Sequence, residues 1–382
     1  MIIGFDAKRA AANFTGLGNY SRYVIEALSE CCPQHEMRLY IPKPYNNAVY
    51  NKLLCNQSVV SVLPDTKIAS VNSSLWRTCG IVSQLRHDKV DLFHGLSNEI
   101  PIRINKSGIA SVVTIHDVIF RHFPAFYGRI DRNIYDFKFG YACRNADRVI
   151  AVSECTKRDI VDIYQINPDK IDVIYQGCNP VFSREVSESE LARVRLAYNL
   201  PDKFILNVGT IESRKNVLLA VKALPLIDEQ YSLVIVGRQT AYIHEICNFI
   251  RTQHLEKRVQ FIHDMDLTDL PVIYRLSQAF VFPSRYEGFG IPIVEALTSG
   301  VPVVAATGSC LEEAGGPATI YVSPDDIDGM ASALQRVLTD DVLRKTMVDS
   351  GREYVLRFDS ALMVSALLET YRKAMEKDCI SC

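Results

Sequence analysis

The sequence predicts an α/β protein made of two doubly wound, Rossmann-like domains, and three observations carry this prediction. The chain has 382 residues, which is enough apolar material for two hydrophobic cores. Short apolar runs alternate with longer amphipathic stretches, which is the pattern of βα units on a parallel sheet. These runs form two sets along the chain, so we expect two sheets that face a cleft between the domains.

The apolar runs are rich in Val, Ile or Phe, as expected for strands that helices cover on both faces. In order, the first set is IIGFDA, MRLYIP, VVSVLP, VDLFHG, SVVTIHD, RVIAVS and IDVIYQG. The second set is FILNVGT, SLVIVG, VQFIHD, AFVFPS, VPVVAAT and TIYVSP. The two sets predict an N-terminal domain over residues 1–180 and a C-terminal domain over residues 181–360.

A segment between the two sets, Asn179–Asp202, contains two prolines and a charged helical stretch, which is typical of a linker. The last predicted helix covers about residues 361–377 and is amphipathic. Its expected core contacts are Leu362, Leu367, Leu368 and Tyr371.

Composition excludes several classes of protein. The net charge of −2 argues against a nucleic-acid binder, which normally carries a basic face. The N-terminus, MIIGFDAKRA, does not have the form of a signal peptide, and no apolar run approaches the roughly 20 residues that a membrane span needs. The eleven cysteines are scattered without a Cys-x-x-Cys pair, which indicates free thiols in a reducing cytoplasm and no zinc site.

The stretch SRYEGFGIPIVEALTSG, which begins at the last residue of AFVFPS, is the most informative in the sequence. Glu287 and Gly288–Gly290 form a predicted loop where backbone can approach a ligand closely. Pro292 suits the first turn of a helix that Gly300 ends, and Glu295 then lies on the second turn. The loop and the helix N-terminus together predict an anion site suited to a diphosphate.

At these residues the sequence resembles the retaining glycosyltransferases of the GT-B fold, in particular glycosyltransferase family 4. Their signature is two glutamates separated by seven residues, with Gly-Phe-Gly after the first, and Glu287 and Glu295 match it. The resemblance implies that Glu287 holds hydroxyls of the donor sugar and Glu295 the ribose hydroxyls. It also implies that the diphosphate lies on the backbone amides of Phe289, Gly290 and Ile291. The alternative is a strand, turn and helix whose glutamates are merely solvated.

A basic pair follows the first strand of the second set. Arg214 and Lys215 come shortly after Gly209, and two cations there can bind a diphosphate and stabilise it as it departs. Lys215 matches the family lysine. Many relatives have arginine directly after the glycine, where this chain has Thr210, so we expect Arg214 to take that role. The alternative is an exposed charge pair at a helix start. The string VGTIESRKN resembles a bacterial mannosyltransferase branch of the family.

Two glycines near the N-terminus, Gly16 and Gly18, are predicted to flank a tight loop before a helix. The string TGLG is similar to the family loop that lies over the donor phosphates and next to the acceptor. It lacks the third glycine and the acidic residue of a dinucleotide fingerprint, which disfavours an NAD enzyme. A simple turn is the alternative.

Histidines end two strands of the first set. His116 ends SVVTIHD, and the resemblance implies that it touches the donor sugar; the alternative is a structural histidine followed by Asp117 as a helix cap. For His94, after VDLF, we favour a structural role.

The stretch Arg121–Arg148 mixes aromatic and basic side chains. It fits either a helix core, which we favour, or a surface that meets a lipid-linked acceptor at a membrane. The triplet Asp264-Met265-Asp266 looks like a metal clamp. We interpret it as accidental and expect neither metal nor cofactor, because Arg214 and Lys215 can serve the diphosphate.

Together these observations predict a retaining glycosyltransferase that acts on a cell-surface glycan or a lipid-linked acceptor. The favoured donor is GDP-mannose, and UDP-sugars come next. By resemblance, the C-terminal helix, 361–382, packs back on the N-terminal, acceptor-side domain. We expect a cytoplasmic protein, with contact at the inner membrane face left open. The alternatives are a GT-B-fold epimerase or phosphorylase, and a non-catalytic nucleotide-sugar-binding protein.

Overall fold

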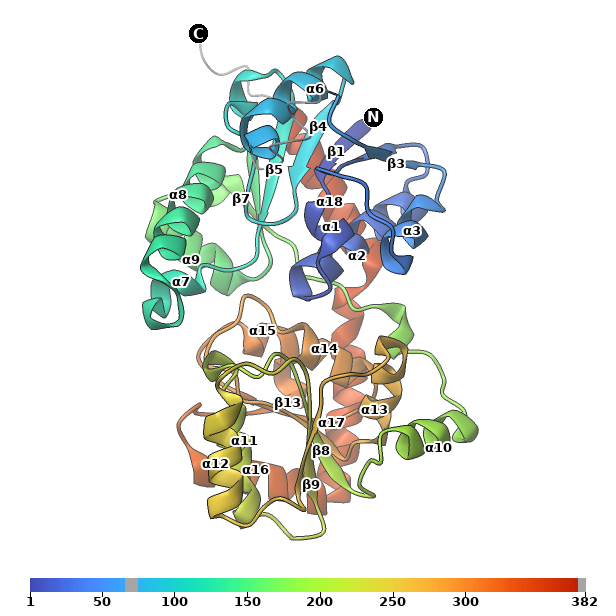
Figure 1. Cartoon of the computed structure of the whole chain (residues 1–382), viewed down its shortest axis with the longest axis vertical. Helices are drawn as coiled ribbons and strands as arrows, with labels where there is room; N and C mark the ends of the chain where they lie inside the picture. The colour runs from blue at the N-terminus through green and yellow to red at the C-terminus, as the bar shows by residue number, and fades with distance from the viewer. Residues whose placement is uncertain (66–74, 377–382) are drawn as a thin grey trace. The chain divides into compact units, whose positions relative to one another are not determined.

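The computed structural model describes residues 1–65 and 75–376 (Figure 1). The chain divides into two compact units. Unit 1 combines Met1–Gly177 with Ser360–Cys382, and unit 2 is Cys178–Asp359. Residues 377–382 of the expected C-terminal helix lie outside the described residues.

Unit 1 is built on a parallel sheet, which has seven strands within the described residues, in the order β3-β2-β1-β4-β5-β6-β7. Its strands are β1 (Ile2–Asp6), β2 (Glu36–Tyr40), β3 (Val59–Val62), β4 (Leu92–Gly95), β5 (Ala110–Ile115), β6 (Arg148–Ala151) and β7 (Ile171–Val173). Each run of the first set forms one of these strands, as predicted. The order reverses between β1 and β4, which makes this pair the topological switch point of the sheet.

Helices cover the sheet of unit 1. They are α1 (Lys8–Ala12), α2 (Gly16–Cys31), α3 (Ala48–Leu54), α6 (Ile81–His87), α7 (Ile119–His122), α8 (Arg129–Asn145), α9 (Glu154–Tyr164) and α18 (Ser360–Met375). The short helical segments are the π-helix η1 (Trp76–Gly80) and the 3₁₀ helices η2 (Ile104–Lys106), η3 (Pro124–Phe126) and η4 (Pro168–Lys170). None of the helices in the described part of the chain is both long and apolar enough to cross a membrane.

The final helix, α18, belongs to unit 1 although the chain reaches it from unit 2 (Figure 1). It packs on α2 and β5. Leu367 and Tyr371 are fully buried there, and Leu368 packs partly against the same core. The prediction for Leu362 is wrong, because this side chain is 58% exposed. The buried stripe runs through Met363, Leu367 and Tyr371 at helical spacing, and Leu362 lies beside that stripe.

Unit 2 repeats the architecture with six parallel strands among its residues, all of which the structure describes, in the order β10-β9-β8-β11-β12-β13. The strands are β8 (Phe204–Val208), β9 (Ser232–Val236), β10 (Val259–Ile262), β11 (Ala279–Phe282), β12 (Val303–Ala306) and β13 (Thr319–Val322). Each run of the second set forms one of them. The switch point of this sheet lies between β8 and β11.

The helices of unit 2 flank its sheet. They are α10 (Glu188–Ala197), α11 (Val217–Ala223), α12 (Ile243–Thr252), α13 (Leu270–Leu276), α14 (Ile291–Thr298), α15 (Leu311–Gly315), α16 (Ile327–Thr339) and α17 (Asp341–Tyr354). The short 3₁₀ helices are η5 (Pro180–Phe182), η6 (Ser213–Lys215), η7 (Leu224–Leu226), η8 (Leu267–Asp269), η9 (Gly316–Ala318) and η10 (Val355–Phe358).

The segment Asn179–Asp202, predicted as a linker, is an integral part of unit 2. Its helix α10 packs on α13. The carboxylate of Asp269 binds this segment at two points, because Arg193 pairs with it at 2.5 Å and the Tyr198 hydroxyl donates to it at 3.0 Å. The linker prediction is therefore wrong. These polar contacts join residues far apart in sequence, so no local pattern in the segment indicates them.

Candidate active site

In unit 2 the structure brings together the two motifs that the sequence analysis assigned to one diphosphate. Arg214 and Lys215 lie in η6, after β8, and Glu287 lies in the loop after the neighbouring strand β11. Lys215 Nζ is 2.5 Å from Glu287 Oε1, and Arg214 Nη1 is 3.0 Å from Glu287 Oε2. The three charged groups thus meet at the switch point of the sheet, the place where ligands bind in doubly wound folds.

The carboxylate of Glu287 is buried and held on both oxygens. The Ser284 hydroxyl also donates to Oε1, at 2.6 Å. Burial by itself raises the pKa of Glu287, but the ion pairs with Lys215 and Arg214 outweigh it and lower the pKa to about 2. Glu287 is therefore ionised at neutral pH, and the alternative of a merely solvated side chain is wrong for this residue.

The two cations are also fixed, so the alternative of an exposed charge pair is wrong. Arg214 Nη1 donates to the Tyr286 carbonyl at 2.6 Å, and its Nη2 pairs with Glu212 at 2.7 Å. The Lys215 ammonium lies 5.2 Å from the centre of the Phe282 ring. Both side chains are mostly buried. A preorganised pair of cations can meet a diphosphate with little reorganisation.

Gly209 and Thr210 lie directly after β8, beside this pair. Gly209 has φ +152°, which an L side chain rarely adopts, and a Cβ there would lie 3.9 Å from Lys215 Cδ. Thr210 is half-buried. The contact of Gly209 and Thr210 with the donor stays a prediction. The structure places both residues next to Arg214 and Lys215, which are predicted to bind the same donor.

The Gly288–Gly290 loop leads into α14 as predicted, with Pro292 in its first turn. Gly290 has φ +116°, and a Cβ there would lie 3.0 Å from Leu311 Cδ2, so a glycine is needed. The Cys310 thiol lies 3.0 Å from the carbonyl oxygens of Glu287 and Phe289. Because the N–H of a trans peptide points opposite to its C=O, the amides of Gly288 and Gly290 point away from Cys310.

Two buried side chains, Phe358 and Cys310, contact this loop. The Phe289 ring packs edge to face on Phe358, at 5.3 Å between ring centres. Both Cys310 and Phe358 are distant in sequence from the loop. Cys310 carries no local motif that identifies it, whereas Phe358 stands near the start of the final helix, where the resemblance implies a tryptophan. Ser284 lies in the motif SRYEGFG, three residues before Glu287. Its place in this motif could have identified it as a partner of Glu287.

Glu295 lies on the second turn of α14, as predicted, in surroundings unlike those of Glu287. The Tyr274 hydroxyl donates to its Oε2 at 3.0 Å. Burial raises the pKa of Glu295 to about 7, a change that the hydrogen bond from Tyr274 only partly opposes. Tyr274, on α13, carried no signal in the sequence.

Replacing Glu295 with glutamine is expected to change the dependence of stability on pH. A free glutamate titrates near 4.5, so between about 4.5 and about 7 the folded protein holds a proton at Glu295 that the unfolded chain has lost. Glu295 therefore makes the free energy of unfolding fall as pH rises through this window, whereas the buried His94 and His116, whose pKa values are lowered, act in the opposite direction. Urea unfolding at several pH values should show that the free energy of unfolding of Glu295→Gln, relative to that of the wild type, rises with pH through this window, and that the exposed control Glu256→Gln gives no such rise. Equal slopes in all three proteins would contradict the assignment.

In unit 1, His116 follows β5 and is buried. Its Nε2 lies 2.8 Å from the Leu96 carbonyl oxygen, so Nε2 carries the proton, and Nδ1 accepts from the Gln176 amide at 3.2 Å. Its ring meets the Tyr20 ring edge to face at 4.6 Å. Burial lowers the pKa of His116 to about 4, so the ring is neutral at pH 7. Its contact with a sugar stays a prediction, and that contact requires Nδ1 to leave Gln176.

Gly16 and Gly18 do not flank a loop, because both lie in the first turn of α2. Asn13 Oδ1 accepts from the Thr15 amide at 2.8 Å and from the Gly18 amide at 3.3 Å, which starts the helix earlier than predicted. A Cβ on Gly18 would lie 1.8 Å from the Asn13 carbonyl oxygen, whereas a Cβ on Gly16 would meet nothing within 4 Å. Gly18 is therefore required by the fold, and Gly16 is open to a functional role.

His94 is structural, as favoured. It is fully buried, with Nδ1 2.7 Å from the Tyr371 hydroxyl and Nε2 2.8 Å from Thr114 Oγ1. Asp117 Oδ1 accepts from the Ile119 amide at 3.1 Å at the start of α7. The contacts of His94 join α18 to the sheet, and the Asp117 contact lies at the start of α7.

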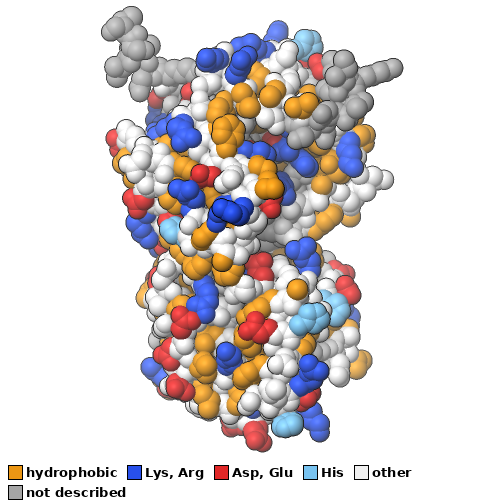
Figure 2. All heavy atoms as spheres, turned by 60° about the vertical axis from the view of Figure 1, so that its left-hand side comes forward, with side chains coloured by type: hydrophobic (Ala, Val, Ile, Leu, Met, Phe, Trp, Pro, Cys, Tyr) orange, Lys and Arg blue, Asp and Glu red, His pale blue; other side chains and the backbone are white. Residues whose placement is uncertain are grey.

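The aromatic and basic segment divides between core and surface. Phe139 is buried and Tyr127 packs against the same core, whereas Phe126 and Phe137 are exposed. Figure 2 brings the α8 side forward, and on this face hydrophobic side chains stand among lysines and arginines. The core interpretation therefore holds for only part of the segment.

Asp266 accepts from the Thr268 amide and caps η8, which explains half of the Asp-x-Asp triplet. Residues 1–65 and 75–376 contain no group of three or more His, Cys, Asp or Glu placed to hold a metal ion.

Comparison with known proteins decides the family. The model of the Glycosyltransferase Family 4 matches residues 14–182, and that of the Glycosyl transferases group 1 matches residues 188–354. The chain is a family 4 glycosyltransferase of the GT-B fold. This glycosyltransferase is 24% identical to the O-antigen chain mannosyltransferase B of Escherichia coli over 371 residues, 94% of this chain and 96% of that protein. It is 27% identical to the O-antigen chain mannosyltransferase RfbU of Salmonella typhimurium over 65% of each chain.

Solved structures share the fold of this glycosyltransferase. Anabaena HepE in complex with UDP and glucose superposes with a TM-score of 0.73 and 19% identity, covering 97% of this chain and 98% of HepE. A glycosyltransferase from Rickettsia africae superposes with a TM-score of 0.75 and 19% identity over 99% of both chains. The two sheets described above therefore form the GT-B architecture.

Proposed function

We propose that this glycosyltransferase transfers mannose from GDP-mannose to a growing glycan of a cell-surface polysaccharide, with retention of the anomeric configuration. The observation that carries the proposal is the contact of Lys215 and Arg214 with Glu287 beside the glycine loop. The string VGTIESRKN and the mannosyltransferase names of two relatives support mannose as the transferred sugar.

In the proposed reaction, the bond between the anomeric carbon and the diphosphate oxygen breaks through an oxocarbenium-like transition state. Lys215, Arg214 and the amides near Gly290 stabilise the departing diphosphate, so no metal ion is required. The acceptor hydroxyl attacks from the face that the diphosphate leaves, and the departing phosphate oxygen takes its proton. Glu287, ionised and fixed, binds hydroxyls of the donor sugar, and Glu295 binds those of the ribose.

A thermal-shift screen against GDP-, UDP- and ADP-sugars tests the donor. A ligand stabilises the fold by RT ln(1 + [L]/Kd), so GDP-mannose is expected to give the largest increase in Tm. The protein should also release nucleoside diphosphate from that donor. The rate of release should not change when EDTA removes metal ions. A larger shift with a UDP-sugar would replace the donor assignment, and inverted configuration in the product, read by NMR, would overturn the retaining mechanism. Binding without turnover in the presence of glycan acceptors would indicate a non-catalytic binder.

A further inference from the structure

Tyr274 holds the carboxylate of Glu295 through a single hydrogen bond. Tyr274 lies on α13, is fully buried and directs its hydroxyl at the first two turns of α14. The hydroxyl oxygen lies 3.0 Å from Glu295 Oε2 and 3.4 Å from the carbonyl oxygen of Pro292. A hydroxyl has one proton to donate, so the shorter distance identifies Glu295 as its main acceptor.

Two aromatic neighbours fix the ring of Tyr274. It packs edge to face on Phe182, with 5.6 Å between ring centres, and it lies 5.3 Å from the ring of Phe280 in β11. A buried ring in such contacts has little freedom to turn or shift. The hydroxyl therefore reaches Glu295 from a fixed direction. Phenylalanine at position 274 would keep this packing and lose only the hydroxyl.

The second oxygen of Glu295 is open to a ligand. The side chain is half-buried, and its Oε1 accepts no hydrogen bond from residues 1–65 and 75–376. A carboxylate oxygen has lone pairs for two hydroxyl donors. Because Tyr274 holds Oε2, the carboxylate is already oriented, and Oε1 can accept the hydroxyls of a ribose without first losing rotational freedom.

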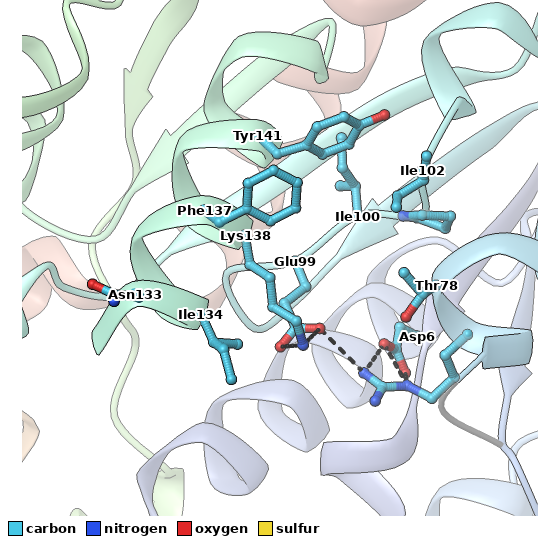
Figure 3. A pocket seen from close by; sticks show the side chains of 12 residues that line it. Asp6, Thr78, Glu99, Ile100, Ile102, Asn133, Ile134, Phe137, Lys138 and Tyr141 are labelled. Atoms are coloured by element: carbon cyan, nitrogen blue, oxygen red, sulfur yellow. Dashed lines mark hydrogen bonds and ion pairs between the residues drawn. The ribbon is translucent and has the colours of Figure 1, made fainter. Parts of the chain in front are cut away.

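Glu295 differs from carboxylates elsewhere in the chain that cations hold. Asp6 lines a cavity of about 310 Å³ in unit 1, which Phe137 also lines (Figure 3). The Arg77 guanidinium fixes Asp6 there, with Nε 3.1 Å from Oδ1 and 3.0 Å from Oδ2. Glu287 has two cationic partners. Glu295 has none among the described residues, so its orientation depends on the Tyr274 hydroxyl.

The groups around Glu295 make its ionisation depend on Tyr274 as well. Helix α14 packs mainly on α15, α17, β11, β12 and η10, and in the described chain none of these elements places a charged group against this carboxylate. Cys178 also faces it, and burial raises the pKa of this thiol, so the thiol is neutral at neutral pH. Burial raises the pKa of Glu295, and the Tyr274 hydroxyl, which donates to the carboxylate, lowers it. Loss of the hydroxyl therefore favours the protonated form.

We propose that Tyr274 is a positioning residue of the donor site, which fixes the Glu295 carboxylate so that its free oxygen accepts the ribose hydroxyls of the nucleoside diphosphate. This assignment rests on the proposed function, because that function gives the ribose to Glu295. Tyr274 itself touches no part of the donor and acts through its contact with Glu295.

The test measures how much the ribose hydroxyls contribute to binding. Calorimetry on the full chain gives the Kd of GDP, UDP and ADP and of their 2′,3′-dideoxy analogues, which lack both hydroxyls. For each base, the ratio of the dideoxy Kd to the ribose Kd reports the contact with Glu295, and the titration of the phosphates cancels in this ratio. In the wild type we expect a ratio of roughly ten or more at about pH 8, because hydrogen bonds to an ionised group are the stronger ones. The ratio should fall as the pH drops through about 7 and the carboxylate takes up a proton.

Tyr274→Phe should move this fall to higher pH by about one unit, because the carboxylate loses the hydrogen bond that stabilises its ionised form. Glu295→Gln should give a small ratio that does not change with pH. The matched control is Tyr231→Phe, which also removes a buried hydroxyl from unit 2, one that donates to the Leu338 carbonyl at 3.1 Å. This control should keep the wild-type profile.

A purely structural role for Tyr274 predicts a different result. If Tyr274→Phe weakened the ribose and dideoxy probes equally and kept the wild-type pH profile, the assignment would be overturned. A wild-type ratio near one, or one independent of pH, would overturn it too, and this measurement does not depend on the folding of any variant. Both results leave the proposed transfer standing, because a nucleoside diphosphate still binds. A preference for UDP or ADP would change the donor base alone, whereas failure of all three to bind would refute both proposals.

Discussion

Replacing Lys215 with alanine is expected to lower turnover by roughly a hundredfold or more, because the departing diphosphate loses a preorganised cation. The affinity for nucleoside diphosphate should fall as well, since the ammonium binds the ground state too. Turnover is measured as steady-state release of nucleoside diphosphate from the donor that the thermal-shift screen selects. Affinity is measured as the Kd for the nucleoside diphosphate product.

A matched control for this variant is Lys257→Ala, which removes an exposed lysine from the same unit. It should retain turnover close to that of the wild type. Unfolding of Lys215→Ala, followed by circular dichroism, checks that the variant still folds, because the substitution leaves Glu287 with Arg214 as its remaining cationic partner. Near-normal turnover of a folded Lys215→Ala protein would remove this lysine from the site.

Glu287→Gln is expected to separate turnover from binding of the product. Turnover should fall by roughly a hundredfold or more, because the donor sugar loses the carboxylate that positions it. The affinity for free nucleoside diphosphate should not weaken, because Lys215 and Arg214 no longer share their charge with Glu287. The measurement pairs kcat with the Kd for the diphosphate, determined by calorimetry.

The control for Glu287→Gln is Glu212→Gln, which also removes a carboxylate from Arg214 but is more exposed than Glu287. Its effect on turnover should stay within about fivefold, the usual limit for an exposed ion pair. Glu287 would have a structural role if Glu287→Gln kept the turnover of the wild type. The same would follow if this variant weakened the binding of the nucleoside diphosphate as much as Lys215→Ala does.

Much of this protein could be predicted from local sequence. Apolar runs marked all thirteen strands found in the described residues, because parallel strands buried on both faces must be continuously apolar. The start of α14 at Ile291 and Pro292 followed from the glycine loop and the proline, which restrict the backbone locally. The amphipathic pattern of α18 predicted Leu367 and Tyr371 correctly as core residues but failed for Leu362, which lies beside the buried stripe.

The sequence predicted that both motifs serve one diphosphate, but it did not predict that their side chains contact each other. Arg214 and Lys215 are distant from Glu287 in sequence, and it was the strand order that made β8 and β11 neighbours and joined them. Tyr274 and Cys310 had no signal, because a hydrogen bond to a backbone carbonyl or to a carboxylate across the fold leaves no local pattern. The same reason explains why His116 looked available in the sequence while Leu96 and Gln176 occupy its ring nitrogens.

The sequence by itself determined the two sheets, the carboxylate and glycine loop after β11, and the basic pair after β8, because these depend on backbone preferences and strand burial over a few residues. The tertiary structure decided which charges meet, that Glu287 is held ionised while the pKa of Glu295 rises to about 7, and that a cavity lies between Asp6 and Phe137. Those properties depend on burial and on distances between side chains far apart in the chain, and only the folded topology sets them.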